Sequence, residues 1–243
     1  MSSENTSYFT KENLNSYLKE LGKEYRRLAG KKTPAEIILI GGAAIIANYG
    51  FRDMTTDVDA IIQAASAMKE AIHLVGDKFH LPNGWLNADF MKTSSFSSKL
   101  VQFSQPYGTF ANVLLVRTVS AEYLVAMKLR SGRKYKNDLS DIIGILYEHE
   151  KRGAPLTMPD IDKAVCDLYG NWEYIPSDFQ KFIEDMMNSG SYEKAYQAIS
   201  DEEQRSKKLM IQFKEDDPGV TNTENANTIL ETLRRRKQQE QDR

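Results

Sequence analysis

The sequence predicts an α+β protein in which a sheet-containing core is followed by a region made only of helices. Residues 36–40 form a short apolar run rich in β-branched residues, which is typical of a buried strand, and a second strand is predicted at residues 57–62, after a short helical segment. From residue 120 onward, apolar residues recur at helical spacing and glycines separate the segments, as in a series of helices. The core is therefore expected to end near residue 118.

Composition excludes several classes of protein. Of the 243 residues, 41% are apolar and 27% are charged, which is ordinary for a globular protein. The net charge of −2 argues against a strongly basic nucleic-acid-coating protein. One cysteine and three histidines exclude a disulfide framework and a structural zinc site. No apolar run reaches the roughly 20 residues that span a bilayer, and the first residues do not resemble a signal peptide, so we expect a cytoplasmic protein without a membrane partner.

The first half of the chain is expected to alternate helices and strands. Its helices are predicted at residues 10–29, 43–49 and 65–79. Thr10 is the predicted N-cap of the first helix, and Gly30 is its predicted C-terminal stop. Two further strands are predicted at residues 100–103 and 110–117. Pro106 and Gly108 between them predict a hairpin turn.

The second half is expected to be helical. Helices are predicted at residues 120–130, 137–150, 158–169, 176–188 and 192–213. The chain then becomes polar and highly charged. We therefore expect three parts: an α/β core with an N-terminal helix (1–118), a helical region packed on it (119–215), and a polar linker with a charged tail (216–243).

Two acids on the second predicted strand suggest a metal site. Asp57 and Asp59 flank Val58, and alternate residues of a strand project from the same face. Neighbouring carboxylates repel each other unless a cation lies between them. Hard oxygen ligands suit Mg²⁺ or Mn²⁺. An Asp-x-Asp pair alone is also common as two solvated surface acids.

Two glycines after the first strand suggest a phosphate site. Gly41 and Gly42 allow a close approach of the backbone to a ligand, and the next helix directs its N-terminal N–H groups to the same place. Gly-Gly alone is also common as a simple turn. The ordered combination is more specific, with 14 residues between Gly42 and Asp57. Phosphates on one side and a metal on the other predict phosphoryl or nucleotidyl transfer.

A basic segment follows on the predicted helix 120–130 and beyond it. Its basic residues are Lys128, Arg130, Arg133, Lys134 and Lys136. Lys128, at the edge of the apolar stripe, either extends along the surface to water or reaches into a site. Asp138 and Asp141 share a helical face, and they either pair with Arg133 and Lys134 or hold Lys128. A solvated basic turn is the remaining interpretation.

Two stretches of the chain resemble a known family. Gly41-Gly42-Ala-Ala followed by Thr55-Thr-Asp57-Val-Asp59 resembles the nucleotidyltransferase fold, and within it the small prokaryotic proteins related to abortive-infection toxins. The segment from Lys128 through Asp138 to Ile142 resembles that family's Leu…Lys-Leu…Arg…Asp…Asp-Ile helix pair. The resemblance spans residues 36–146. It implies a mixed β-sheet flanked by helices, with a helical region behind it.

The resemblance also implies a function. We expect a Mg²⁺-dependent nucleotidyltransferase that moves a nucleoside monophosphate from an NTP to an RNA or protein acceptor, with pyrophosphate leaving. The expected metal ligands are Asp57 and Asp59, and the expected catalytic residues are these two and Lys128. The expected triphosphate ligands are Gly41, Gly42, Lys128 and Arg133. In a toxin–antitoxin setting the acceptor would be tRNA or a protein, and a cognate antitoxin would be a partner.

The sequence departs from the family pattern in two ways. Many members carry a third carboxylate on a later strand, whereas both predicted later strands lack acids. The candidates for that position are Asp89, Asn112 and Gln102, and the candidates for a general base are Asp89 and Asp138. Members also often carry Arg two residues before the Thr of the motif, where this chain has Asp53 with Arg52 adjacent. The alternative function is therefore a catalytically weak or inactive protein of the same fold that binds a nucleotide or a partner.

Overall fold

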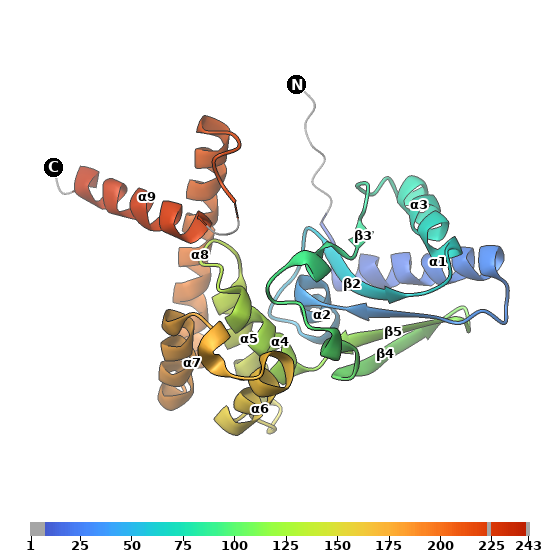
Figure 1. Cartoon of the computed structure of the whole chain (residues 1–243), viewed down its shortest axis with the longest axis horizontal. Helices are drawn as coiled ribbons and strands as arrows, with labels where there is room; N and C mark the ends of the chain where they lie inside the picture. The colour runs from blue at the N-terminus through green and yellow to red at the C-terminus, as the bar shows by residue number, and fades with distance from the viewer. Residues whose placement is uncertain (1–7, 223–224, 242–243) are drawn as a thin grey trace. The chain divides into compact units, whose positions relative to one another are not determined.

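The computed structural model describes residues 8–222 and 225–241. They form two compact units. The first holds the described residues up to Met127 together with Pro159–Asn171, and the second holds Lys128–Met158 and the described residues from Trp172 onward. The fold is α+β, with a mixed sheet flanked by helices and further helices after it (Figure 1). The predicted fold class is confirmed.

The first unit is built on a five-stranded mixed sheet. Its strands are β1 (Ala35–Leu39), β2 (Val58–Gln63), β3 (Leu86–Asn87), β4 (Ser104–Phe110) and β5 (Leu114–Val119). They lie in the order β3-β2-β1-β5-β4. Strand β1 is antiparallel to β2 and parallel to β5. The central strand is fully buried at Ile37, Ile38 and Leu39, which explains its continuous apolar run.

The helices of this unit begin and end close to the predicted positions. They are α1 (Lys11–Ala29), α2 (Gly41–Asn48), α3 (Ala67–Phe79) and, apart from its first residue, α6 (Met158–Tyr169). Helix α1 starts with a capping box, in which the Thr10 hydroxyl accepts from Asn13 N–H and the Asn13 side chain accepts from Thr10 N–H. Gly30 ends the helix. Local capping chemistry therefore sets both of its ends.

The predictions for residues 98–113 are wrong in two places. Residues Ser98–Val101 form the 3-10 helix η2 rather than a strand. Strand β4 passes through the predicted turn at Pro106, which is tolerated because β4 is an edge strand. The hairpin turns instead at Ala111 and Asn112, whose φ angles are 50° and 58°. Two consecutive positive φ values match the right-handed twist of the paired strands. The turn could not be predicted from the sequence at this position, because alanine does not favour a positive φ.

The second unit contains only helices as regular structure in its described part. They are α5 (Asp138–Lys151), α7 (Ser177–Ser189), α8 (Tyr192–Asp216) and α9 (Ala226–Gln241), with the short 3-10 helix η3 (Trp172–Tyr174). Helix α4 (Ala121–Ser131) crosses the boundary between the units. Helix α9 lies within the part predicted as a linker and tail, and its Leu230 is fully buried in a cluster with Met210 and Ala226.

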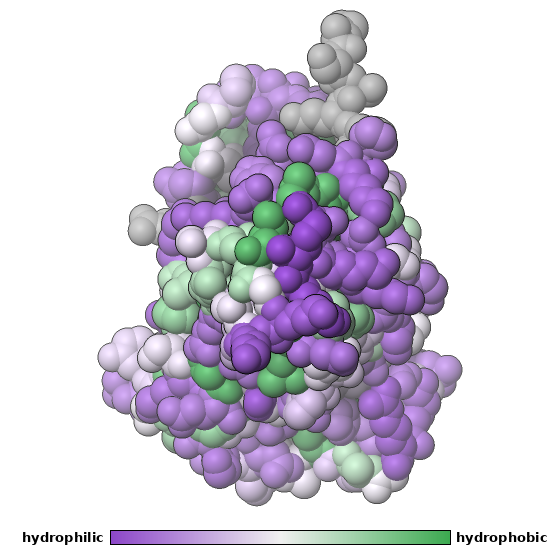
Figure 2. Space-filling model, turned by 90° about the vertical axis from the view of Figure 1, so that its right-hand side faces the viewer, coloured by the Kyte–Doolittle hydropathy of each residue, from purple (hydrophilic) through white to green (hydrophobic). Residues whose placement is uncertain are grey.

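The face of the chain drawn in Figure 2 is mostly polar. On the face drawn in Figure 2, hydrophilic side chains predominate and apolar ones form small separate groups. Among the described residues, no helix combines the length and the apolar character that crossing a membrane requires.

Candidate functional site

The two acids of the Asp-x-Asp motif lie at the start of β2. Asp57 is exposed and immediately precedes the strand, and Asp59 is half-buried within it. Val58 and Ala60, which alternate with them, are both fully buried. This alternation places the apolar pair in the core and the two aspartates on the other side of the strand.

Strand β3 brings a polar residue beside Asp59. Asn87 is the register partner of Asp59 in the parallel β2–β3 pair, so both side chains project from the same face. The Asn87 amide donates to Gly84 O at 3.2 Å and its oxygen accepts from Asp89 N–H at 2.9 Å. The neighbour of Asp59 is thus an amide. Sequence reasoning missed Asn87 because a two-residue strand has no detectable periodicity.

The three candidates for a third carboxylate position do not lie on a strand next to β2. Asp89 belongs to the 3-10 helix η1 (Asp89–Lys92) and pairs with the exposed Lys92 at 2.8 Å. Asn112 lies in the turn between β4 and β5, and β1 separates these strands from β2. Gln102 follows η2.

The two glycines form the first turn of α2 but have different surroundings. Gly41 has a φ of +52°, and a Cβ atom there would meet nothing within 4 Å. At Gly42, a Cβ would lie 2.4 Å from Thr55 Oγ1 and 3.1 Å from Arg52 Nη2. Gly41 therefore faces open space, whereas Gly42 permits the close approach of two side chains. The N-cap of α2, Ile40, makes no side-chain cap to the first-turn N–H groups, and such a helix end attracts anions.

A chain of hydrogen bonds links Arg52, which lies beside Gly42, to the Asp-x-Asp motif. Arg52 Nη2 donates to Thr55 Oγ1 at 3.3 Å, and the Thr55 hydroxyl donates to Asp57 Oδ1 at 3.2 Å. Arg52 Nε also donates to Met54 O at 2.9 Å. A guanidinium therefore lies beside Gly42, although Asp53 occupies the position where the resembled family often has arginine. The only sign of this in the sequence was that Arg52 is the adjacent residue.

The N-terminal segment braces the same loop. Phe9 and Thr55 exchange two backbone hydrogen bonds, of 2.8 and 2.9 Å. The Phe9 ring is fully buried and contacts the rings of Tyr17 and Trp85. The backbone that leads into Asp57 is thereby attached to the core of the first unit.

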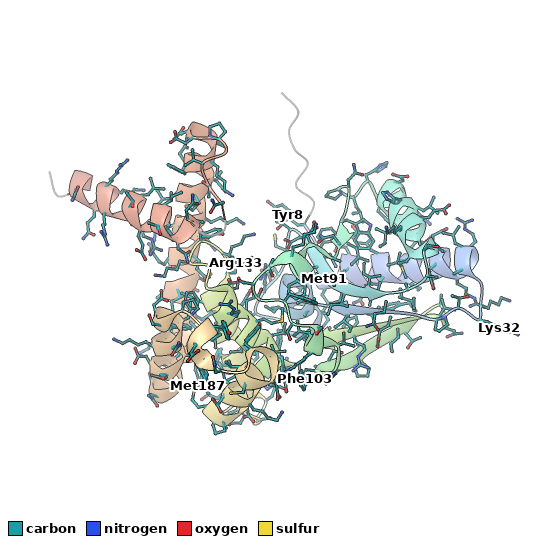
Figure 3. All side chains as sticks on the ribbon, viewed as in Figure 1. Tyr8, Lys32, Met91, Phe103, Arg133 and Met187 are labelled. Atoms are coloured by element: carbon teal, nitrogen blue, oxygen red, sulfur yellow. The ribbon has the colours of Figure 1, made fainter. Side chains whose placement is uncertain are left out.

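Lys128 lies in the second unit, where two aspartates hold it. Its side chain is 9% exposed, and Nζ lies 2.8 Å from Asp138 Oδ1 and 2.8 Å from Asp141 Oδ2. Arg133, between α4 and α5 (Figure 3), donates to Asp138 through Nε at 2.9 Å and Nη2 at 3.1 Å. The two aspartates therefore hold Lys128, and Asp138 also pairs with Arg133, so both expected pairings occur at Asp138. Lys134 pairs instead with residues of other helices, Asp178 and Glu231.

Asp138 is poorly suited to act as a general base. It is fully buried, which raises the pKa of its carboxyl, but Lys128 and Arg133 more than offset this effect and hold the pKa well below its usual range. A general base works best with a pKa near the working pH. The geometry and the charge of Asp138 instead suit a role in holding Lys128.

Asp57 and Asp59 are the two carboxylates that are predicted to hold a metal ion in the described part of the first unit. In the part of the chain that the structure describes, no group of three or more His, Cys, Asp or Glu side chains could hold a metal ion. Asp57 and Asp59 offer hard oxygen donors. This small set fits Mg²⁺, which keeps several waters and takes ligands from substrate phosphates.

Comparison with known proteins identifies one related family. The model of a family described as nucleotidyltransferase of unknown function (DUF6036) matches residues 16–148, which is more than half of the chain. The matched range includes both glycines, both aspartates of the Asp-x-Asp motif and the cluster around Lys128. No match was found among curated proteins or among solved structures.

Proposed function

The chain belongs to the family of nucleotidyltransferases of unknown function (DUF6036), and from this premise we propose a Mg²⁺-dependent transfer reaction. A nucleoside monophosphate moves from an NTP to a hydroxyl of an RNA or protein acceptor, and pyrophosphate leaves. The observation that supports this most is the position of Gly42, which lies close to Arg52 and Thr55, two residues that are linked by hydrogen bonds to Asp57. This arrangement joins a phosphate-binding element to a metal-binding element within one compact unit.

The proposal gives each element of the first unit a role. Asp57 and Asp59 hold Mg²⁺, which supplies neutralising charge for the triphosphate and lowers the pKa of the attacking hydroxyl. Gly41 leaves the start of α2 open to phosphate oxygens. Arg52, beside Gly42, adds a positive charge that suits phosphate.

Lys128 and Arg133 stay predicted ligands of the triphosphate. Their bonds to Asp138 and Asp141 support a role in which Lys128 is held in one orientation. A preorganised cation stabilises developing charge more effectively than a flexible one, because no reorganisation is needed during the reaction.

The second candidate function is a catalytically weak or inactive protein of this family that binds a nucleotide or a partner. Two observations favour it. Asn87 stands beside Asp59 where a third carboxylate would serve, and Asp138, one of the two candidate bases, has a strongly lowered pKa. A toxin role, a tRNA acceptor and a cognate antitoxin are further proposals that depend on the sequence resemblance alone.

The test combines binding with transfer. The double variant Asp57→Asn/Asp59→Asn keeps the shape of both side chains but removes two like charges, so its thermal stability should stay level or rise, as is common at functional sites. Its affinity for Mg²⁺ with NTP, and any labelling of RNA or protein by radiolabelled NTP, should fall. Asp53→Asn, an exposed acid of the preceding loop, is the matched control.

Each result has a defined meaning. Labelling by the wild type that is lost in the double variant supports the transferase. Binding of Mg²⁺ and NTP without any labelling supports the second candidate. An unstable double variant that binds Mg²⁺ and NTP like the wild type would end the metal-site hypothesis.

A further inference from the structure

A buried carboxylate outside the matched family range caps α5. Glu203 of α8 is 4% exposed. It accepts from the backbone N–H groups of Leu139 at 2.9 Å and Ser140 at 3.3 Å, and from the Ser140 hydroxyl. The N-cap of α5, Asn137, makes no side-chain capping bond. Glu203 therefore supplies from another helix the acceptors that the first turn of α5 lacks locally.

The same turn carries the residues that hold Lys128. Asp138 and Asp141 are 0% and 1% exposed, and Leu139 and Ser140 lie between them in the chain. A shift of this backbone would move both carboxylates together. By fixing the two N–H groups, Glu203 also fixes the geometry of the ion pairs with Lys128.

The charges around Glu203 are unbalanced. The cluster formed by α4, α5 and the segment between them contains the acids Asp138 and Asp141 and the bases Lys128 and Arg133, so it is neutral before Glu203 is counted. On the α9 side, Arg234 pairs with Glu202 at 2.6 Å and bonds Ser206. Within residues 8–222 and 225–241, no basic side chain forms an ion pair with Glu203.

This environment makes the charge of Glu203 sensitive to pH. Burial raises the pKa of Glu203 to about 7, its hydrogen bonds from Leu139 and Ser140 act in the opposite direction, and the nearby Asp141 carboxylate raises the pKa further. Asp138, in contrast, has a lowered pKa and stays ionised near neutrality. Glu203 is thus an acid whose charge changes close to neutral pH.

We propose that Glu203 is a positioning residue: it holds the first turn of α5 so that Asp138 and Asp141 keep Lys128 in place, and its charge tunes how strongly Lys128 attracts triphosphate. The inference rests on the proposed function for the role of Lys128 toward triphosphate. With Glu203 neutral, two carboxylates balance two cations. With Glu203 ionised, a third negative charge weakens the attraction of the cluster for an anion.

Amide hydrogen exchange tests the positioning role without any nucleotide. Glu203→Ala removes both acceptors, so exchange at the Leu139 and Ser140 amides should accelerate by about tenfold, the factor expected for a lost hydrogen bond. Glu203→Gln retains an acceptor oxygen and should restore slow exchange. Glu215→Gln, an exposed acid on the same helix, should behave like the wild type. Unchanged exchange in Glu203→Ala would overturn the proposal.

Nucleotide binding tests the electrostatic role. The affinity for each of the four common NTPs with Mg²⁺ is measured from the acid to the alkaline side of neutrality. Relative to Glu203→Gln, the wild type and Glu215→Gln should lose affinity several-fold as Glu203 ionises. The Glu203→Gln side chain is neutral at every pH, so its profile reports the titration of the triphosphate itself.

Lys128→Met separates the two proposals. If it weakens binding while Glu203→Gln follows the wild-type pH profile, the inference about Glu203 is wrong and the function of Lys128 stands. If Lys128→Met binds NTP like the wild type, the role of Lys128 fails and the electrostatic part of the inference is overturned with it. The exchange measurement then still decides whether Glu203 holds α5.

Discussion

Replacing Gly42 with alanine should disrupt the loop before the Asp-x-Asp motif. The new Cβ would lie 2.4 Å from Thr55 Oγ1 and 3.0 Å from Thr55 Cβ, against 3.4 Å or more in ordinary contact. One group must therefore move by about 1 Å. Thr55 is 2% exposed, and both its backbone N–H and its backbone carbonyl are hydrogen-bonded to Phe9. Thr55 therefore cannot move easily to make room for the new methyl group. Overpacking of this kind costs about 1–3 kcal/mol.

A double-mutant cycle isolates this contact from other effects. Gly41→Ala is the matched control: it has open space but a φ of +52°, so it should cost about 1 kcal/mol through backbone strain alone. Thr55→Ala removes the oxygen nearest to the new methyl group. In urea denaturation, Gly42→Ala should therefore cost at least about 1 kcal/mol less in the Thr55→Ala background, while the cost of Gly41→Ala should not change.

The result that would refute this reasoning is additivity. If Gly42→Ala costs the same free energy of unfolding with and without the Thr55 hydroxyl, the close approach of these residues does not explain why position 42 is glycine. A fully stable Gly42→Ala variant would lead to the same conclusion.

Three further predictions concern the second unit and the candidate base Asp89. Asp138→Asn leaves Lys128 buried with one carboxylate fewer and should lower the free energy of unfolding by about 3–5 kcal/mol in urea denaturation. Because the pKa of Asp138 is lowered in the folded state, the stabilisation that its carboxylate provides is present above the ordinary carboxyl pKa and is lost as the pH falls. The difference in stability between the variant and the wild type should therefore narrow in acid. Leu230→Ala should cost about 2–5 kcal/mol, whereas removing residues 235–243 should change stability by less than about 1 kcal/mol; thermal melts in which the truncation costs as much as Leu230→Ala would contradict this. Asp89→Asn should leave any labelling by radiolabelled NTP unchanged, because Asp89 is exposed and paired with a lysine; a loss of labelling would instead support Asp89 as the base.

Local chemistry made much of the fold predictable. Thr10 and Gly30 mark the ends of α1 because capping depends on residues a few positions apart. The buried strands β1 and β2 could be recognised by their β-branched composition. The position of the hairpin turn was predicted wrongly because the turn uses Ala111 and Asn112. The strand pairing imposes a positive φ on Ala111, and alanine does not favour that conformation.

The candidate site was predictable only in part. Gly41, Gly42, Asp57 and Asp59 could be selected because they belong to a continuous strand–turn–helix–strand segment. Asn87 could not, because its position beside Asp59 follows from strand pairing.

The sequence by itself determined the fold class, the order of most helices, the ends of the first helix and the candidate glycines and aspartates. Only the tertiary structure decided which partners these residues have. In the structure, Arg52 and Thr55 lie close to Gly42, and Lys128 forms ion pairs with Asp138 and Asp141. Glu203 contacts the start of α5, although it lies 63 residues further along the chain. The physical reason is that caps and periodicity depend on neighbours within a few residues, whereas the partner of a buried polar group depends on which surfaces pack together to exclude water.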